Sequence, residues 1–276
     1  MISDKPPSKT RVPSYPAGTI VSASSGGPIS FEALVDDLAS ARVVYIGEIH
    51  SDAAHHRIQL RIIQALKDRA PDMAVGMEMF AIPYHPILEQ WSAGELDQQG
   101  FLEKTHWYAN WRYRYDLYKD ILDYIAKAHI PLVGLNIPFH IPAKVRVGGL
   151  ANLLESEKQF LPADIDTRNP EHRAYLKPIF KRHHFSDRMN FEYFYEAQCL
   201  WEDTMAESIA RHIGGRFMVV LAGNGHIIYG FGIPDRAYSR TGASYRTIYL
   251  APVQSEFELE YADYVWITPE AADDAE

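Results

Sequence analysis

Short apolar runs alternate with amphipathic helical patterns along most of the chain, and this alternation limits the folds open to it. The run VVYI (Val43–Ile46) is followed by a helical pattern in which Ile58, Ile62 and Leu66 recur every four residues. A second apolar run, MAVGMEMF (Met73–Phe80), comes next. This order predicts an α/β fold with a mainly parallel, mixed central sheet and helices on both faces.

The rest of the chain continues the alternation. Apolar runs at 130–138, 216–226, 245–251 and 262–268 predict further strands, and helical spacing predicts helices at about 118–129 and 194–213. A polar and aromatic stretch from 142 to 190 has no strand pattern. Together with the aromatic segment before it, we interpret this stretch as an inserted helical lobe at about 100–190.

The composition of the two ends predicts the domain limits. Residues 1–30 are rich in Ser, Pro and Gly, which is typical of a flexible lead-in, and 269–276 read as an acidic tail. We expect one domain at 31–268, because a chain of 276 residues that is 47% hydrophobic can bury one substantial core.

Charge and cysteine content exclude some classes of function. A formal net charge of −9 disfavours binding to nucleic acid, which needs clustered Lys and Arg. The basic cluster at 168–184 is either a solvated helix face or a local site for the carboxylates of a ligand. Cys199 is the only cysteine, so an intrachain disulfide is excluded and a small packed residue is expected.

Polar residues stand where the predicted strands end. Ligands of open α/β sheets bind outside the carboxyl ends of the strands, where loops converge. We therefore predict one pocket there, formed by Glu48, His50, Glu78, Asn224 and His226. Its supporting residues are expected to be Gly47, Gly223, Gly225, Asn136 and His56.

The residue types in this pocket indicate acid–base or metal chemistry. Glu48 and His50 lie two apart, so in an extended chain they face the same way and the carboxylate can orient the imidazole. The alternative is that Glu48 accepts backbone N–H groups of the following helix and His50 serves as a cap. Glu78 stands between two methionines, and a buried carboxylate needs a partner such as His50, His226 or a divalent metal ion.

An aromatic segment, HWYANWRYRYDLY (106–118), precedes the lobe. Trp107, Trp111, Tyr115 and Tyr118 recur in it at helical spacing, which is typical of core packing. The alternative is a wall for a flat, conjugated ligand, because aromatic faces supply a large contact area.

Four phrases of the sequence resemble a known family. They are GEIH with the following HHRIQL, the strand GMEMF, the helix AQCLWEDTMAESIA, and VVLAGNGHIIYGFGIPDR, and together they span about 41–266. In this order they are similar to the ChaN-like haem-binding uptake family. That family belongs to a larger grouping that also contains Tiki proteases, TraB-type proteins and erythromycin esterases.

The resemblance implies a haem-binding protein for iron or haem uptake or handling. Family members of this kind hold haem between the two subunits of a homodimer, with a tyrosine on the iron. A haem outside the sheet would use aromatic and basic residues of the lobe region. The candidates are Trp107, Trp111, Tyr175, Tyr193, Tyr195, Arg173, Lys177, Lys181, Arg182 and His183.

The wider grouping implies a second function, hydrolysis with a metal ion or by water activation. That role would fall on His50, His226, Glu78 and Glu48, with a divalent metal at the first three and Asn224 or the backbone of Gly225 stabilising developing charge. A scaffold with neither activity is the third alternative.

The resemblance also bears on location. Family members are often bacterial lipoproteins, but this chain has no lipobox cysteine, which leaves peripheral membrane association open. Its start, MISDKPPSKT, lacks the apolar core of a secretory signal, and no stretch resembles a membrane span. A cytoplasmic location is expected unless a signal was removed, in which case the periplasmic side of the envelope is expected.

Overall fold

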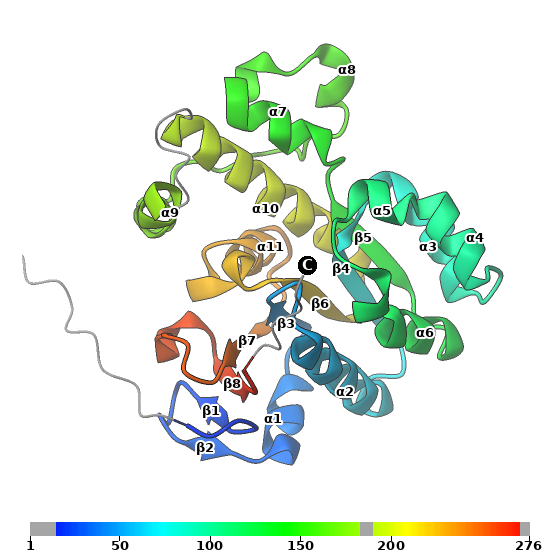
Figure 1. Cartoon of the computed structure of the whole chain (residues 1–276), viewed down its shortest axis with the longest axis vertical. Helices are drawn as coiled ribbons and strands as arrows, with labels where there is room; N and C mark the ends of the chain where they lie inside the picture. Colours follow the sequence, from blue (N-terminus) through cyan, green and yellow to red (C-terminus); the bar gives the residue numbers. More distant parts are fainter. Residues whose placement is uncertain (1–14, 183–189, 271–276) are drawn as a thin grey trace, which may run out of the picture.

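The computed structural model describes residues 15–182 and 190–270, which are built around one eight-stranded sheet (Figure 1). The strand order is β2-β1-β8-β7-β3-β6-β4-β5. From β8 to β5 neighbouring strands run parallel, whereas β1 is antiparallel to both β8 and β2. The strands are β1 (Ile20–Ser22), β2 (Pro28–Ile29), β3 (Val43–Glu48), β4 (Met73–Ala81), β5 (Leu132–Asn136), β6 (Phe217–Gly223), β7 (Tyr245–Pro252) and β8 (Tyr264–Thr268).

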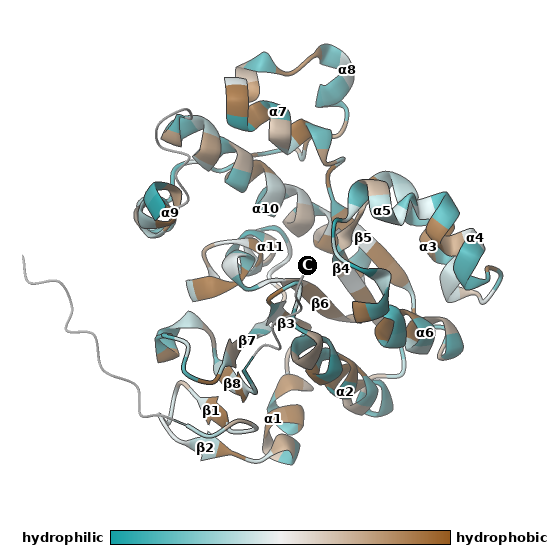
Figure 2. Ribbon diagram, in the orientation of Figure 1, coloured by the Kyte–Doolittle hydropathy of each residue, from teal (hydrophilic) through white to brown (hydrophobic). Residues whose placement is uncertain are grey.

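Helices cover both faces of the sheet because side chains of a strand alternate between faces. Val44 and Ile46 pack with the first group of helices, and Val43 and Tyr45 pack with the second. The first group is α1 (Phe31–Leu38), α2 (Ala53–Arg69), α3 (His85–Ser92), α4 (Gln98–Thr105), α5 (Trp107–Asn110) and α6 (Lys119–Lys127). The second group is α10 (Phe191–Ile213) and α11 (Ile233–Thr241). Figure 2 shows hydrophobic residues concentrated on the central strands.

The remaining elements are short helices and single turns. Three helices lie toward the outer end of α10, namely α7 (His140–Gly148), α8 (Glu155–Lys158) and α9 (Pro170–Arg182) (Figure 1). The 3₁₀ turns are η1 (Ile82–Tyr84), η2 (Tyr115–Leu117), η3 (Leu150–Asn152), η5 (Asn224–His226), η6 (Ile228–Gly230) and η7 (Leu259–Tyr261). In the described part of the chain, no helix has the length and apolar character needed to cross a membrane.

Two long helices are fixed by caps that the sequence encodes. Asp52 accepts a hydrogen bond from Ala54 N (2.7 Å) at the start of α2, and Asn190 accepts one from Glu192 N (2.8 Å) at the start of α10. Helix α10 ends at Gly214, whose φ of +46° lies in the left-handed region that favours glycine. These residues fix where α2 begins and where α10 begins and ends.

Two expectations about the chain's organisation differ from the structure. Residues 20–29 were expected in the flexible lead-in, yet Ile20–Ser22 pairs with β8 and Pro28–Ile29 with β1, because a parallel edge strand offers free backbone groups. The lobe at about 100–190 is not one body. Its first part packs in the main core beside the sheet, β5 lies inside its range, and only α7 to α9 form separate small cores with α10.

Candidate functional site

Neighbouring parallel strands bring the predicted residues to one edge of the sheet. Glu48 is the last residue of β3 and pairs in register with Gly223, the last residue of β6. Strand β4, which carries Glu78, lies on the other side of β6. His50 Nδ1 donates to Glu48 Oε1 over 2.7 Å, so the carboxylate orients the imidazole as the spacing predicted.

Two imidazoles converge on one oxygen of Glu78. His50 Nε2 lies 3.9 Å from Glu78 Oε1, and His226 Nε2 lies 3.5 Å from the same atom. The other oxygen, Oε2, accepts a hydrogen bond from Gly223 N at 2.7 Å. The side chains remain in reach of solvent, with exposed fractions of 21% for His50, 12% for His226 and 9% for Glu78.

A second carboxylate, Glu202 of α10, orients His226. His226 Nδ1 lies 3.3 Å from Glu202 Oε1, which also accepts from Gln198 Nε2 at 2.7 Å. The other oxygen of Glu202 lies 3.4 Å from His172 Nε2 and 3.5 Å from Arg236 Nε. The site is therefore a chain of alternating groups, Glu48–His50–Glu78–His226–Glu202, which we call the Glu78 site.

Glu202 was not among the predicted residues. Its signal in the sequence is a carboxylate one helical turn after Gln198 within a mostly apolar helix. A buried acid in that position needs a partner. The partner comes from a strand end that is distant in sequence, so helical spacing alone does not identify it.

Side chains rather than backbone hold Glu48. Tyr118 OH donates to Oε1 at 2.6 Å and Gln59 Nε2 donates to Oε2 at 2.7 Å, while His56 Nε2 lies 3.5 Å from Oε1. Asp52, not Glu48, caps helix α2. The capping alternative for Glu48 is therefore wrong, and His56 supports the site as predicted by lying against its first carboxylate.

Gly47, Gly223 and the two asparagines, Asn136 and Asn224, pack next to the site. A Cβ on Gly47 would lie 2.1 Å from Asn224 Oδ1, so that position has no room for a side chain. A Cβ on Gly223 would lie 3.0 Å from His50 Nε2 and would fit only if that imidazole moved. Asn224 Nδ2 donates to Leu250 O (2.9 Å) and Asn136 Nδ2 donates to Glu78 O (2.9 Å). Asn224 thus contacts β7 and Gly47 rather than the imidazoles, and no atom lies within 4 Å of a Cβ on Gly225.

Negatively charged carboxylates alternate with positively charged imidazoles along the Glu78 site. Burial raises the pKa of Glu78, but the charges of His226 and His50 outweigh it and lower the pKa to about 2. Burial lowers the pKa of His226, and the carboxylates of Glu78 and Glu202 reverse this and raise it to about 10. Burial likewise opposes the charge of His50, whose pKa Glu78 and Glu48 raise. The pKa of Glu48, also opposed by burial, is lowered by His50 and His56.

The divalent-metal alternative gains no support from the side-chain geometry. Within residues 15–182 and 190–270, no group of three or more His, Cys, Asp or Glu side chains is arranged to hold a metal ion. The ring nitrogens of His50 and His226 that face the centre both point at a carboxylate oxygen.

The aromatic segment packs mostly in the main core. Trp107, Tyr115 and Tyr118 are buried in the main core. Trp111, which also belongs to the main core, and Tyr113 contact the ring of His50, with centroid separations of 4.8 and 5.1 Å. Most of the segment is core, and two of its rings form one side of the Glu78 site.

The lobe tyrosines lie in three different environments. Tyr195 is buried and its hydroxyl donates to Asn169 O at 3.0 Å, so it is not available to an iron ion. Tyr193 lies over Gly149 at the end of α7. Tyr175, on α9, is half-buried and packs edge-on against Tyr229 at 5.8 Å.

The basic candidates also differ. Arg173 is paired with Glu192, whereas Lys177, Lys181 and Arg182 are exposed on α9. His183 lies outside the described residues.

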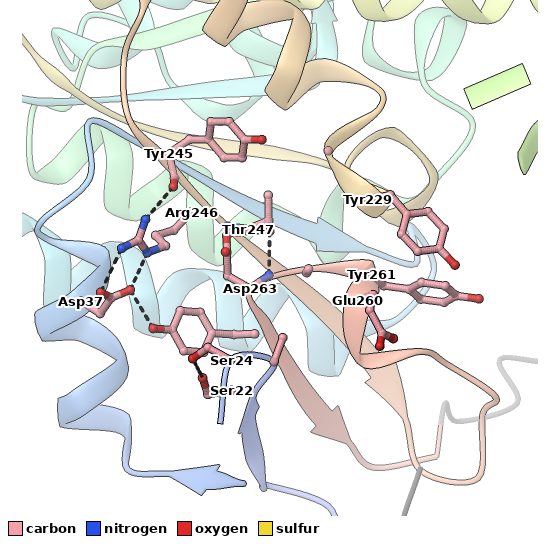
Figure 3. A pocket seen from close by; sticks show the side chains of 14 residues that line it. Ser22, Ser24, Asp37, Tyr229, Tyr245, Arg246, Thr247, Glu260, Tyr261 and Asp263 are labelled. Carbon is pink, nitrogen blue, oxygen red and sulfur yellow. Dashed lines mark hydrogen bonds and ion pairs between the residues drawn. The ribbon is translucent and has the colours of Figure 1, made fainter. Parts of the chain in front are cut away.

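A cavity of about 520 Å³ lies apart from the Glu78 site, beside β1, β7 and β8 (Figure 3). Two of its charged groups, Asp37 and Arg246, are paired with each other. Arg246 Nε donates to Asp37 Oδ2 at 2.6 Å, and Tyr264 OH donates to the same oxygen at 2.7 Å. Tyr229 and Tyr261 also line the cavity (Figure 3).

Comparison with known proteins agrees with the fold. A model of the family described as haem-binding uptake, Tiki superfamily, ChaN matches residues 34–237. The structure described as cofacial haem binding to ChaN of Campylobacter jejuni matches with a TM-score of 0.74 at 19% identity, over 90% of this chain and 95% of that chain. An erythromycin esterase mutant in its open conformation matches with a TM-score of 0.49 at 14% identity, over 85% of this chain and 77% of that one. No curated protein matches.

Proposed function

The chain belongs to the ChaN family of haem-binding uptake proteins in the Tiki superfamily, and from this premise we propose that it binds haem for iron or haem uptake or handling. The observation that carries the proposal is the match of the family model over residues 34–237. A haem site needs an axial ligand, apolar or aromatic walls, and cations for two propionates.

The face of α9 around Tyr175 fits these needs. Tyr175 packs on Tyr229, and the rings of Tyr229 and Tyr249 each lie against Tyr261 at 5.1 and 5.3 Å. The charge of Arg182 reaches both Tyr175 and Tyr261, since it lowers the pKa of each hydroxyl against the larger effect of burial. Tyr175 would hold the iron, while Lys181 and Arg182 would hold the propionates. When bound, haem supplies an iron centre that takes axial ligands and changes oxidation state.

Tyr175 suits this role better than the other lobe tyrosines. Tyr195 is buried and already hydrogen-bonded. Tyr193 lies next to Gly149, and so does a carboxylate oxygen of Glu196. The negative charge of Glu196 would repel the propionates of a haem bound at Tyr193. Burial raises the pKa of Tyr175, so haem uptake requires loss of the phenolic proton and should strengthen as pH rises.

An absorption titration with haemin tests the assignment. We expect a stoichiometric shift of the Soret band and a charge-transfer band typical of tyrosine ligation. Tyr175→Phe should abolish both, and the matched variant Tyr193→Phe should keep them. An unchanged spectrum in Tyr175→Phe would contradict the assignment.

We also propose that the haem-loaded protein is a homodimer, as the family resemblance implies. Sedimentation velocity with and without haemin measures this directly. The proposal predicts twice the mass of one chain in the loaded sample. A loaded monomer would contradict it.

The Glu78 site favours hydrolysis by water activation as a second candidate function. Each histidine is paired with a carboxylate through Nδ1, His50 with Glu48 and His226 with Glu202, and the Nε2 atoms of both histidines face Glu78. We propose that Glu78 accepts a proton from an attacking water and that His226, held protonated by its raised pKa, donates to the oxygen on which charge develops. Hydrolysis of 4-nitrophenyl acetate tests this. Glu78→Gln should lower kcat/KM at least roughly 100-fold, and equal rates in both proteins would contradict it.

A further inference from the structure

Two buried residues, His172 of α9 and Arg236 of α11, lie behind Glu202 of the Glu78 site. We infer that both are positioning residues, which hold Glu202 so that its Oε1 atom stays directed at His226. The inference stands on the geometry of these side chains, and it rests on the second candidate function only for its effect on a reaction rate. It does not depend on haem binding at Tyr175.

The two oxygens of Glu202, which is fully buried, have different surroundings. Oε1 accepts a hydrogen bond from Gln198 Nε2 at 2.7 Å and lies 3.3 Å from His226 Nδ1. Oε2 accepts no hydrogen bond from any described residue. It lies 3.4 Å from His172 Nε2 and 3.5 Å from Arg236 Nε, and these two nitrogens have no hydrogen-bond partner among the described residues either. Because a buried carboxylate oxygen is costly without a positive or donating neighbour, these two groups keep Oε2 in its position.

Arg236 orients the ring of His172. Arg236 Nη2 lies 3.4 Å from His172 Nδ1, and a guanidinium can only donate, so Nδ1 is the acceptor. Burial lowers the pKa of His172, so the ring is neutral near pH 7 and its one proton is on Nε2, the atom that faces Glu202 Oε2. The ring also packs on Tyr195 and Phe231, with centroid separations of 5.5 and 6.3 Å, which limits its rotation.

Arg236 is in turn fixed by α10 and by the segment before α9. Its Nη1 atom is paired with Asp203 and donates to Asp166 O at 3.0 Å, and its Nη2 atom donates to Cys199 Sγ at 3.3 Å. Arg236 and Asp203 are both buried. Since the N–H groups of a guanidinium form a rigid fork, these contacts also fix the direction of Arg236 Nε, which faces Glu202.

The other carboxylate that orients a histidine of the site is held differently. Glu48, which contacts His50, also has a second histidine beside it, because His56 Nε2 lies 3.5 Å from Glu48 Oε1. Each oxygen of Glu48 additionally accepts a hydrogen bond from another side chain. Glu202 Oε2 has no such bond within the described part of the chain, so its position depends on the two residues behind it.

Proton exchange at the His226 side chain tests the inference without relying on any reaction. In NMR spectra of isotope-labelled protein, the Nδ1–H proton of His226 reports the contact with Glu202, and we expect it to exchange slowly with water. Arg236→Met removes the cation and His172→Phe removes the donor, while both keep most of the side-chain volume. Each should speed this exchange at least roughly tenfold, in line with the loss of one hydrogen-bonding partner. Arg236→Lys restores the charge and should restore most of the protection.

The matched control is Arg240→Met. Arg240 lies on the same helix and also pairs with Asp203, at 2.8 Å, but its ion pair is with Asp203 and not with Glu202. The His226 proton should therefore exchange at the wild-type rate in this control. Wild-type exchange in both site variants, or equal acceleration in Arg240→Met, would overturn the inference. Circular dichroism first confirms that each variant is folded, and if Arg236→Met does not fold, His172→Phe decides the test.

Hydrolysis of 4-nitrophenyl acetate separates this inference from the second candidate function. In the wild-type background, Arg236→Met should lower kcat/KM roughly tenfold, whereas in Glu202→Gln it should have little further effect, because both residues act through one group. Fully additive losses would contradict the inference. A protein that does not hydrolyse the ester at all would refute the second candidate function, and the exchange rates would still decide the role of His172 and Arg236.

Discussion

Glu78 sets the protonation of both histidines at the residue level. Its charge is the first cause that raises the pKa of His226 and of His50 against the lowering by burial. Glu78→Gln keeps the size of the side chain and the hydrogen bond to Gly223 N while removing the charge. We expect the His226 pKa to fall from about 10 by roughly 1–2 units. Titration of the imidazole by NMR measures this, and an unchanged midpoint would contradict the charge chain.

The raised pKa of His226 also predicts how stability depends on pH. A histidine whose pKa is higher in the folded state, about 10 against 6.5, stabilises the fold fully below pH 6.5. That contribution is lost as pH rises toward 10. We expect the free energy of unfolding in urea to fall across this window by on the order of 5 kcal/mol. His226→Gln should show a flatter profile, and identical profiles would refute the assignment.

The sequence indicated which polar groups stand in the last residues of a strand or shortly after it. Glu48, His50, Glu78 and His226 meet because the ends of parallel strands share one edge. Glu202 was not predicted because it lies on helix α10, and tertiary packing determines which face of that helix points at the strand ends. The orientation of the Asn224 side chain could not be predicted either, because its contacts with Gly47 and β7 determine it.

At the level of elements, α7 and α9 should be less stable than the sheet. They pack on α10 through small apolar clusters separate from the main core. Amide hydrogen exchange should therefore be faster in α7 and α9 than in 217–221 of β6, by at least roughly tenfold. The aromatic segment at 106–118 should exchange slowly, because Trp107 and Tyr118 are buried in the main core. Equal rates in α9 and β6 would contradict this division.

Long elements were predictable from the sequence and short ones were not. Helix α10 and strand β6 carry long periodic or apolar patterns that local physics determines. Strands β1 and β2 have three and two residues, which is too short for a period, and they exist because β8 offers an edge.

For the whole molecule, the α/β class followed from the alternation of elements, and the likeness to ChaN confirms it. The order of strands did not follow, because it depends on which crossovers pack best. The resulting arrangement places the Glu78 site at the strand ends, where two histidine–carboxylate pairs meet. The Tyr175 face combines α9 with Tyr229, Tyr261 and Tyr249 of β7. We therefore expect two separable sites in one domain.

A haemin titration of the double variant His50→Ala/His226→Ala, beside Tyr175→Phe, tests this separation most directly. Far-ultraviolet circular dichroism confirms that each variant is folded before the titration. The account predicts that the double variant takes up haemin with nearly the wild-type spectrum and affinity, while Tyr175→Phe loses the tyrosine-ligated band. A folded double variant that no longer binds haemin would contradict it, because the strand-end histidines would then be the haem site.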